Sequence, residues 1–152
     1  FAFYLQFYPP KNFRDVEAFS KNVLPPICAG GETLLSITDT ELAESYELRL
    51  IERLRSANQD DRGIGEARGH LFSSAEEDDL VAMFSLTVAM GWEAYLYMPK
   101  TCSVMLNWEG DILDFWTSDR SIFEEVTRLI GVFGLQETKK HCFDCEPPVP
   151  ND

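Results

Sequence analysis

The side chains that could do chemistry in this 152-residue chain are its carboxylates, two histidines and four cysteines. Two short runs gather six of the carboxylates: Asp60 and Asp61, then Glu76, Glu77, Asp78 and Asp79. Such runs could attract a divalent cation, but calcium loops space their ligands alternately around a turn glycine. Consecutive carboxylates on one helix point in different directions. The second run is better interpreted as acidic residues stabilising a helix N-terminus.

The string HCFDC, from His141 to Cys145, is the most motif-like sequence in the chain. Structural zinc needs four nitrogen or sulfur ligands, whereas Cys28 and Cys102 are single and distant in sequence. A redox C-x-x-C motif should open a helix after a strand, but this one lies in a proline-containing tail. We therefore expect no cofactor, with Cys142 and Cys145 as weak metal candidates and a reversible disulfide as the alternative.

Enzymatic catalysis has little support in the motifs. A nucleophile needs a base beside it, and the only histidines are His70 and His141. Neither a Gly-x-Ser-x-Gly elbow nor a His-Glu-x-x-His motif occurs. A carboxylate pair could act as acid and base, yet none of the 26 acidic residues is singled out. An enzyme using carboxylates or His70, with a divalent cation, is thus an alternative hypothesis.

The charge of the chain restricts its partners. It has 26 acidic and 13 basic residues, a formal charge of −13. Residues 32–79 alone hold 13 acidic and 5 basic residues, which is −8 of that total. Such a field repels phosphate backbones and anionic lipids, so we expect neither nucleic-acid nor membrane binding. Basic proteins are the favoured partners, although much of the charge simply keeps a surface solvated.

The hydrophobic pattern predicts a single α+β domain over residues 1–135 and a polar, proline-containing tail over 136–152. We expect a mainly antiparallel sheet of four or five strands with the helices mostly on one face. The predicted strands are 1–8, 92–98, 102–109 and 111–118, with 32–38 as a further candidate. The predicted helices are 13–24, 41–57, 74–90 and 121–133.

Local signals place the ends of these elements. Asn12 is a predicted N-cap with Asp15 at the third helical position, and Pro25–Pro26 should end that helix. Ser73-x-x-Glu76 is a capping box. Residues 41–57 fit both a helix and an alternating strand, but their length and their Leu, Glu and Arg content favour a helix.

A tight hairpin with Glu109–Gly110 at its tip is predicted between the last two strands. If Trp108 faces Asp111, one face of the hairpin is the purer core face. Its predicted cross-strand pairs are Leu106 with Leu113 and Val104 with Phe115.

Trp108 lies beside three carboxylates, those of Glu109, Asp111 and Asp114. An aromatic residue among carboxylates is typical of a surface that binds a basic protein, although the ring could also pack the hairpin onto a helix. The predicted partner-binding residues are therefore Trp108, Glu109, Asp111, Asp114, Glu76, Glu77, Asp78, Asp79, Asp60 and Asp61.

Small size, acidity and the lack of catalytic motifs together favour a non-enzymatic, bacterial-type binding protein. It would sequester a basic protein, as immunity proteins and antitoxins do; the likeness is one of size and charge, without a shared motif. A regulatory domain with no activity of its own is a further alternative.

We expect a cytoplasmic protein, because no apolar run reaches 18 residues and no signal-like stretch opens the chain. The sequence begins at Phe1 rather than Met, which leaves open whether a segment was removed. The oligomeric state is also left open.

Overall fold

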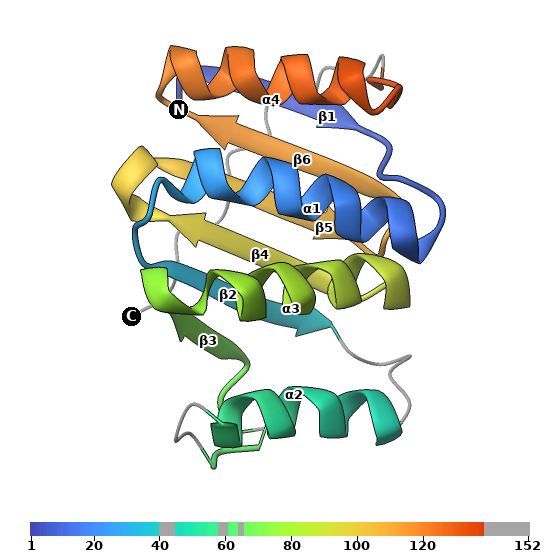
Figure 1. Cartoon of the computed structure of the whole chain (residues 1–152), viewed down its shortest axis with the longest axis vertical. Helices are drawn as coiled ribbons and strands as arrows, with labels where there is room; N and C mark the ends of the chain where they lie inside the picture. Colours follow the sequence, from blue (N-terminus) through green and yellow to red (C-terminus); the bar gives the residue numbers. More distant parts are fainter. Residues whose placement is uncertain (40–44, 58–60, 64–65, 139–152) are drawn as a thin grey trace.

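The computed structural model describes residues 1–39, 45–57, 61–63 and 66–138, which form an α+β fold with one antiparallel sheet (Figure 1). The strands are β1 (Phe3–Phe7), β2 (Thr33–Asp39), β3 (Gly69–Phe72), β4 (Glu93–Met98), β5 (Ser103–Trp108) and β6 (Ile112–Thr117). The helices are α1 (Phe13–Cys28), α2 (Ser45–Ala57), α3 (Glu77–Met90) and α4 (Arg120–Val132). Two short 3-10 helices are η1 (Ser74–Glu76) and η2 (Pro99–Thr101).

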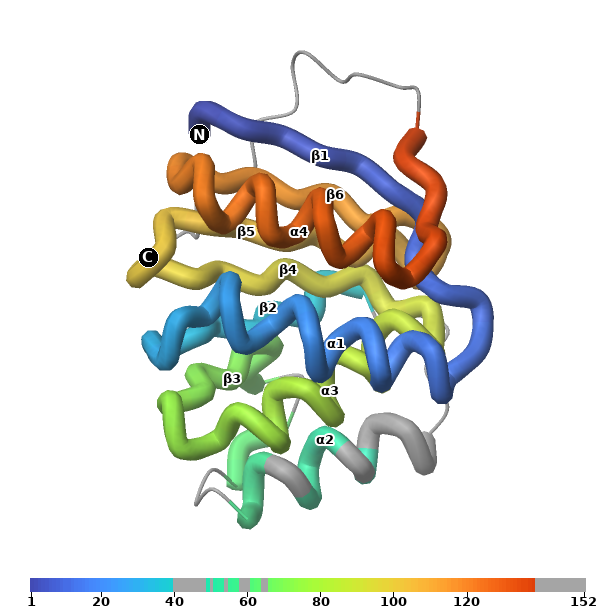
Figure 2. Tube along the Cα trace, turned by 45° about the horizontal axis from the view of Figure 1, so that its top comes forward, coloured from blue at the N-terminus to red at the C-terminus, as the bar shows by residue number. Residues whose placement is uncertain are grey.

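The six strands are ordered β1-β6-β5-β4-β2-β3, so the predicted number of four or five was wrong. The missing strand was β3, which is only four residues long and follows a polar, glycine-rich segment. It therefore offers too little alternation to be recognised. Helices α4, α1 and α3 lie side by side over one face of the sheet, and α2 lies beyond the β3 edge (Figures 1 and 2).

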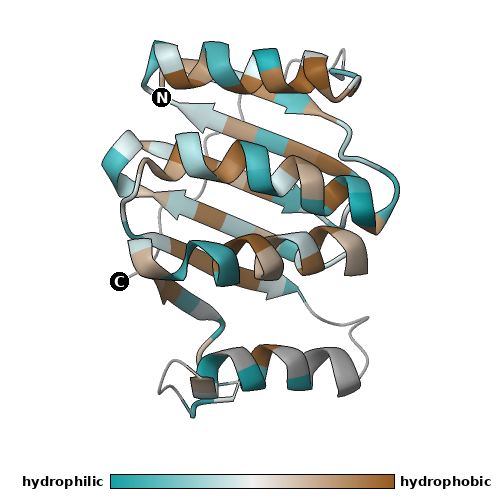
Figure 3. Cartoon of the chain, viewed as in Figure 1, coloured by the Kyte–Doolittle hydropathy of each residue, from teal (hydrophilic) through white to brown (hydrophobic). Residues whose placement is uncertain are grey.

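The core lies between the sheet and these three helices. Alternate strand residues face the helices, because successive side chains in a strand point to opposite faces. The buried strand residues of this core are Leu5, Phe7, Leu35, Ile37, Phe72, Ala94, Leu96, Met98, Met105, Leu113 and Phe115. Apolar and polar bands alternate accordingly along the strands in Figure 3.

Helix α1 begins as predicted but runs four residues further than expected. The Asn12 side chain accepts a hydrogen bond from the Asp15 backbone N–H at 3.0 Å, which confirms the cap. Pro25 and Pro26 lie inside the helix. Each removes one backbone hydrogen bond, but Ile27 and Cys28 are buried and hold the last turn against the core.

Helix α2 settles the choice between helix and strand for residues 45–57, which are helical; residues 41–44 of that prediction lie outside the described residues. Helix α4 starts one residue early, because Asp119 caps it by accepting hydrogen bonds from the backbone N–H groups of Ser121 and Ile122. The first tail residues, Gln136–Thr138, pair with the outer edge of β1; the rest of the predicted tail lies outside the described residues.

The β5–β6 hairpin has a different register from the predicted one. Asp111 donates its backbone N–H to the Trp108 carbonyl at 2.8 Å, and Glu109 and Gly110 have positive φ values of 47° and 74°. Strand pairing then begins with Trp108 opposite Ile112. Asp111 is therefore an extra residue on one side of the hairpin, and it shifts every pair by one position.

This shift corrects the predicted core face. Leu106 pairs with Asp114 and Val104 pairs with Trp116, instead of with Leu113 and Phe115. The β5 residues that face the helices are Ser103, Met105 and Asn107, as shown by their pairing with Thr117, Phe115 and Leu113. The buried Asn107 is accommodated because its amide donates to the Trp92 carbonyl at 2.8 Å and accepts from the Gly110 N–H at 3.1 Å.

Candidate functional site

The sheet face opposite α1, α3 and α4, which we call the second face, carries five aromatic side chains that lie outside the main core. No described helix lies on it. Strand alternation and the observed register assign its residues. On β1, β6, β5 and β4 they are Tyr4, Gln6, Ile112, Asp114, Trp116, Val104, Leu106, Trp108, Glu93, Tyr95 and Tyr97.

A small apolar cluster forms the base of the second face. Val104, Leu106 and Trp116 are buried, and three half-buried tyrosines pack against them. The Tyr4 ring lies 5.4 Å from that of Trp116. Tyr95 and Tyr97 stack at 5.8 Å with their planes 13° apart. The aromatic rings therefore cover the aliphatic side chains. The second face is more buried than an ordinary protein surface but less buried than the core.

Asp114 is the hub of the face. Its Oδ1 accepts hydrogen bonds from the Tyr4 hydroxyl at 2.6 Å and from Gln6 Nε2 at 2.8 Å. Its Oδ2 accepts one from Trp108 Nε1 at 2.5 Å. The residue is only 4% exposed, whereas Trp108 is 45% exposed. One carboxylate thus fixes two aromatic rings from different strands.

All three donors to Asp114 are neutral. None of the ion pairs formed among the described residues involves this carboxylate. Moreover, the six described strands contain neither Lys nor Arg. Their carboxylates are those of Asp39, Glu93 and Asp114. Asp39 pairs with Glu93 after a bulge in β2, which brings it to the same face. The strand residues of the second face are therefore aromatic and acidic.

Two tyrosines of the second face have a raised pKa that is due mainly to burial and in part to nearby carboxylates. Burial and the hydrogen bond donated to Asp114 raise the pKa of the Tyr4 phenol. Burial also raises the pKa of Tyr95, and the negative charges of Glu93 and Asp114 raise it further. The nearby carboxylates make a further negative charge on this face less favourable, whereas burial, the larger cause of both shifts, disfavours a charge of either sign.

The structure brings together only part of the predicted partner-binding set. Trp108 and Asp114 are in direct contact, and Glu109 and Asp111 are exposed at the adjoining hairpin tip. Four second-face residues were missed: Tyr4, Gln6, Glu93 and Tyr95. Only their strand alternation could have indicated them, and using it requires the correct register of the hairpin.

The acidic run from Glu76 to Asp79 lies elsewhere. The hairpin tip packs against the last turn of α3, because a Cβ on Gly110 would lie 2.4 Å from the Val88 carbonyl oxygen. The acidic run starts the same 14-residue helix, whose length is about 21 Å. Hydrogen bonds from the Ser73 hydroxyl and backbone N–H lower the pKa of Glu76, which commits that carboxylate to capping.

The other acidic run is only partly described. Asp61 is exposed and accepts a 3.3 Å hydrogen bond from the Ser56 hydroxyl, while Asp60 lies outside the described residues.

His70 does not gather catalytic partners around it. It belongs to β3 and faces the helix side, with its ring 4.4 Å from that of Phe72. Its Nε2 lies 3.7 Å from Glu76 Oε1, and its side chain is 11% exposed. The described residues contain no group of three His, Cys, Asp or Glu side chains placed to hold a metal ion. Cys142 and Cys145 lie outside them.

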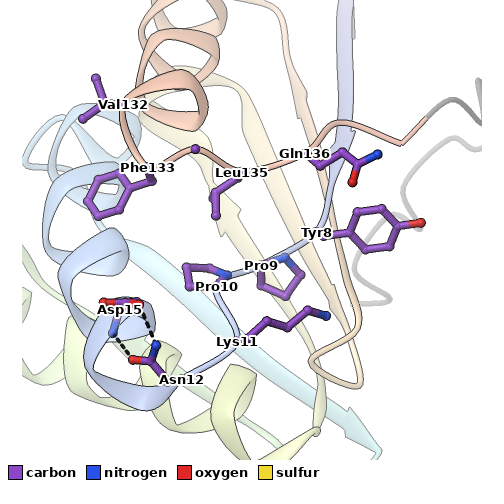
Figure 4. A pocket seen from close by; sticks show the side chains of 11 residues that line it. Tyr8, Pro9, Pro10, Lys11, Asn12, Asp15, Val132, Phe133, Leu135 and Gln136 are labelled. Carbon is purple, nitrogen blue, oxygen red and sulfur yellow. Dashed lines mark hydrogen bonds between the residues drawn. The ribbon is translucent and has the colours of Figure 1, made fainter.

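A hollow of about 840 Å³ lies between the turn that precedes α1 and the end of α4 (Figure 4). Its polar side chains already have local roles. Asn12 and Asp15 bond each other at the start of α1, and Lys11 Nζ lies 5.8 Å from the centre of the Tyr8 ring. The hollow contains none of the predicted site residues, so the second face is the better candidate.

No family model, curated protein or solved structure matches this chain. None of the described helices is both long and apolar enough to cross a lipid bilayer. The chemistry of the second face is therefore the basis on which a function can be proposed.

Proposed function

We propose that this protein is a non-enzymatic binding protein that sequesters a basic protein through the Trp108 end of the second face, in the manner of immunity proteins and antitoxins. The supporting observation is the Trp108–Asp114 contact within strands that lack Lys and Arg. Trp is enriched at binding hot spots, and carboxylates steer a basic partner and set its orientation. A cytoplasmic location belongs to the same proposal and is consistent with the free thiols of Cys28 and Cys102.

The hairpin tip supports the same surface. Glu109 has a positive φ of 47°, a conformation in which Gly or Asn is preferred over Glu. Glu109 is exposed, so its side chain does not compensate this strain by packing. Its carboxylate adjoins Trp108, where a basic partner would meet it. A strained residue of this kind is consistent with selection for binding.

The test is affinity capture from the native host at low and at high salt, with wild-type protein and three variants. We expect a basic protein that binds the wild type at low salt and is released at high salt, because screening weakens exposed charge pairs. Trp108→Ala should no longer capture this basic protein, although the substitution leaves the net charge of the chain unchanged. Glu109→Asn should bind more weakly while unfolding at a higher urea concentration, since Asn tolerates the backbone conformation.

Glu77→Gln is the matched control for Glu109→Asn, because it removes one charge at the distant start of α3 and should capture the partner normally. Equal capture by the wild type and Trp108→Ala would refute the assignment to this face. Equal losses in Glu77→Gln and Glu109→Asn would show that only net charge matters.

A further inference from the structure

The Trp108 ring is fixed at one edge and open on the rest. Its Nε1–H is held by Asp114, while almost half of the side chain is exposed. Indole is the best aromatic surface for a cation. A ring whose orientation is already fixed loses little freedom when a ligand stacks on it.

Asp114 supplies a counter-charge that the described residues do not neutralise. An ionised carboxylate offers about four acceptor sites, and three are filled by the neutral donors of Tyr4, Gln6 and Trp108. By this count one acceptor site remains on Oδ2, the oxygen that also accepts from Trp108. A charge that is 4% exposed and surrounded by neutral groups is costly to keep, so a cation beside it is favoured.

Glu93 brings a second carboxylate close to the indole. Ala94 pairs with Asn107, and the same register continued by one position places Glu93 opposite Trp108. Directly opposed residues have Cβ atoms about 4.5–5.5 Å apart. Glu93 already accepts a 2.6 Å hydrogen bond from the Thr38 hydroxyl, which orients its carboxylate. This register places the indole between the carboxylates of Glu93 and Asp114, which belong to the strands on either side of β5.

Resting on the proposed function, we infer that the second face recognises arginine side chains, with Trp108 as the stacking surface and Asp114 and Glu93 as the flanking charges. A guanidinium group is planar, so it can stack on the indole while its N–H edge points at a carboxylate. It is also more weakly hydrated than the ammonium group of lysine. That difference matters here because Asp114 is nearly buried, and a ligand must shed water to approach it.

The direct test uses three acetylated and amidated pentapeptides in which glycine alternates with arginine, with lysine or with citrulline. Binding is measured by calorimetry and by tryptophan fluorescence on the whole chain. We expect the arginine peptide to bind about three- to tenfold more tightly than the lysine peptide, as the difference in stacking and hydration implies. The neutral citrulline peptide should not bind measurably.

Variants assign the effect to the site. Trp108→Ala should abolish the preference for arginine, whereas Trp108→Phe keeps a ring and should retain part of it. Trp92 and Trp116 are buried, so Trp108→Phe should also remove most of the fluorescence response. Glu124→Gln on α4 is the control, because it removes one exposed charge from the opposite side of the sheet and should leave binding unchanged.

Equal affinity for the lysine and arginine peptides, or binding of the citrulline peptide, would overturn the inference. These results would not affect the proposed function, which is tested separately by the salt-dependent capture of a basic protein and its dependence on Trp108. An arginine preference that persists in a folded Trp108→Ala variant would also overturn the inference, because it would place the site elsewhere.

Discussion

Replacing Asp114 by Asn tests whether this carboxylate organises the second face. The change keeps the size of the side chain and exchanges one acceptor oxygen for an NH₂ group. Three donors converge on the wild-type carboxylate, from Tyr4, Gln6 and Trp108. An amide oxygen placed toward Tyr4 and Gln6 leaves an NH₂ group facing the indole N–H, where two donors cannot bond each other.

The expected cost follows from that mismatch. A hydrogen bond to a charged group contributes about 1.5–3 kcal/mol. Removal of a charge that no described cation pairs with offsets part of this loss. We therefore expect Asp114→Asn to lower the free energy of unfolding by about 1–2 kcal/mol. For a domain of this size the melting temperature should fall by roughly 2–8 °C.

The assay is urea unfolding followed by circular dichroism, in a double-mutant cycle with Trp108→Phe. The phenylalanine ring lacks the indole N–H, so it removes the same hydrogen bond from the donor side. We expect the double variant to lose about 1 kcal/mol less than the sum of the single losses, as for residues in contact. Additive losses would show that Asp114 does not hold Trp108. An Asp114→Asn variant as stable as the wild type would refute the role of Asp114 in organising the second face.

Two further predictions concern the hairpin tip and the tyrosines. Gly110→Ala should destabilise the fold by about 1–3 kcal/mol, because the added Cβ would lie 2.4 Å from the Val88 carbonyl oxygen at a φ of 74°. Gly131→Ala in α4, where a Cβ would have no neighbour within 4 Å, should instead stabilise it by about 0.5–1 kcal/mol. Equal urea midpoints for the two variants would contradict both expectations. Because the pKa of Tyr4 is raised in the folded protein, its protonated phenol stabilises the fold fully below about pH 10, the usual tyrosine pKa. This contribution to the free energy of unfolding is lost as the pH rises through the pKa of Tyr4 in the folded protein. Absorbance at 295 nm should show the highest-pH tyrosine step disappearing in Tyr4→Phe; an unchanged titration would refute the link.

The sequence predicted the elements that local chemistry determines. The Asn12 cap and the Ser73–Glu76 capping pair are both present, because their hydrogen bonds join residues three positions apart. The last three long strands were also recognised, since each is rich in β-branched and aromatic residues. The fold class followed from these elements.

The position of β1 at the edge of the sheet and the end of α1 depend on tertiary contacts that the sequence pattern does not reveal. Strand β1 is rich in apolar residues on both faces, a pattern typical of a central strand, yet it is the first strand of the sheet order. The Tyr4 ring on the second face packs against Trp116, and the Tyr4 hydroxyl donates a hydrogen bond to Asp114. These contacts partly bury the ring without a layer of helices. Likewise, burial of Ile27 and Cys28 carries α1 past two prolines.

The acidic composition favours a basic partner, and the carboxylates it singled out lie in separate places in the structure. Counting charges along the chain drew attention to residues 76–79, because four carboxylates in succession dominate any local sum. The structure uses them at the start of α3, whereas the hairpin lies against the last turn of that helix. The single carboxylate of Asp114 is less conspicuous in sequence, but its aromatic surroundings and its burial make it the stronger feature.

The register of one hairpin decides whether the proposed site exists. In the predicted register Trp108 opposes Asp111, which would put Trp108 and Asp114 on opposite faces of the sheet. The extra residue Asp111 moves each pair by one position and brings both side chains to the second face. Gly110 holds that arrangement by lying directly against the α3 carbonyl of Val88. The contact that positions the indole beside a carboxylate is therefore a tertiary one, and the pattern of strand residues alone could not have revealed it.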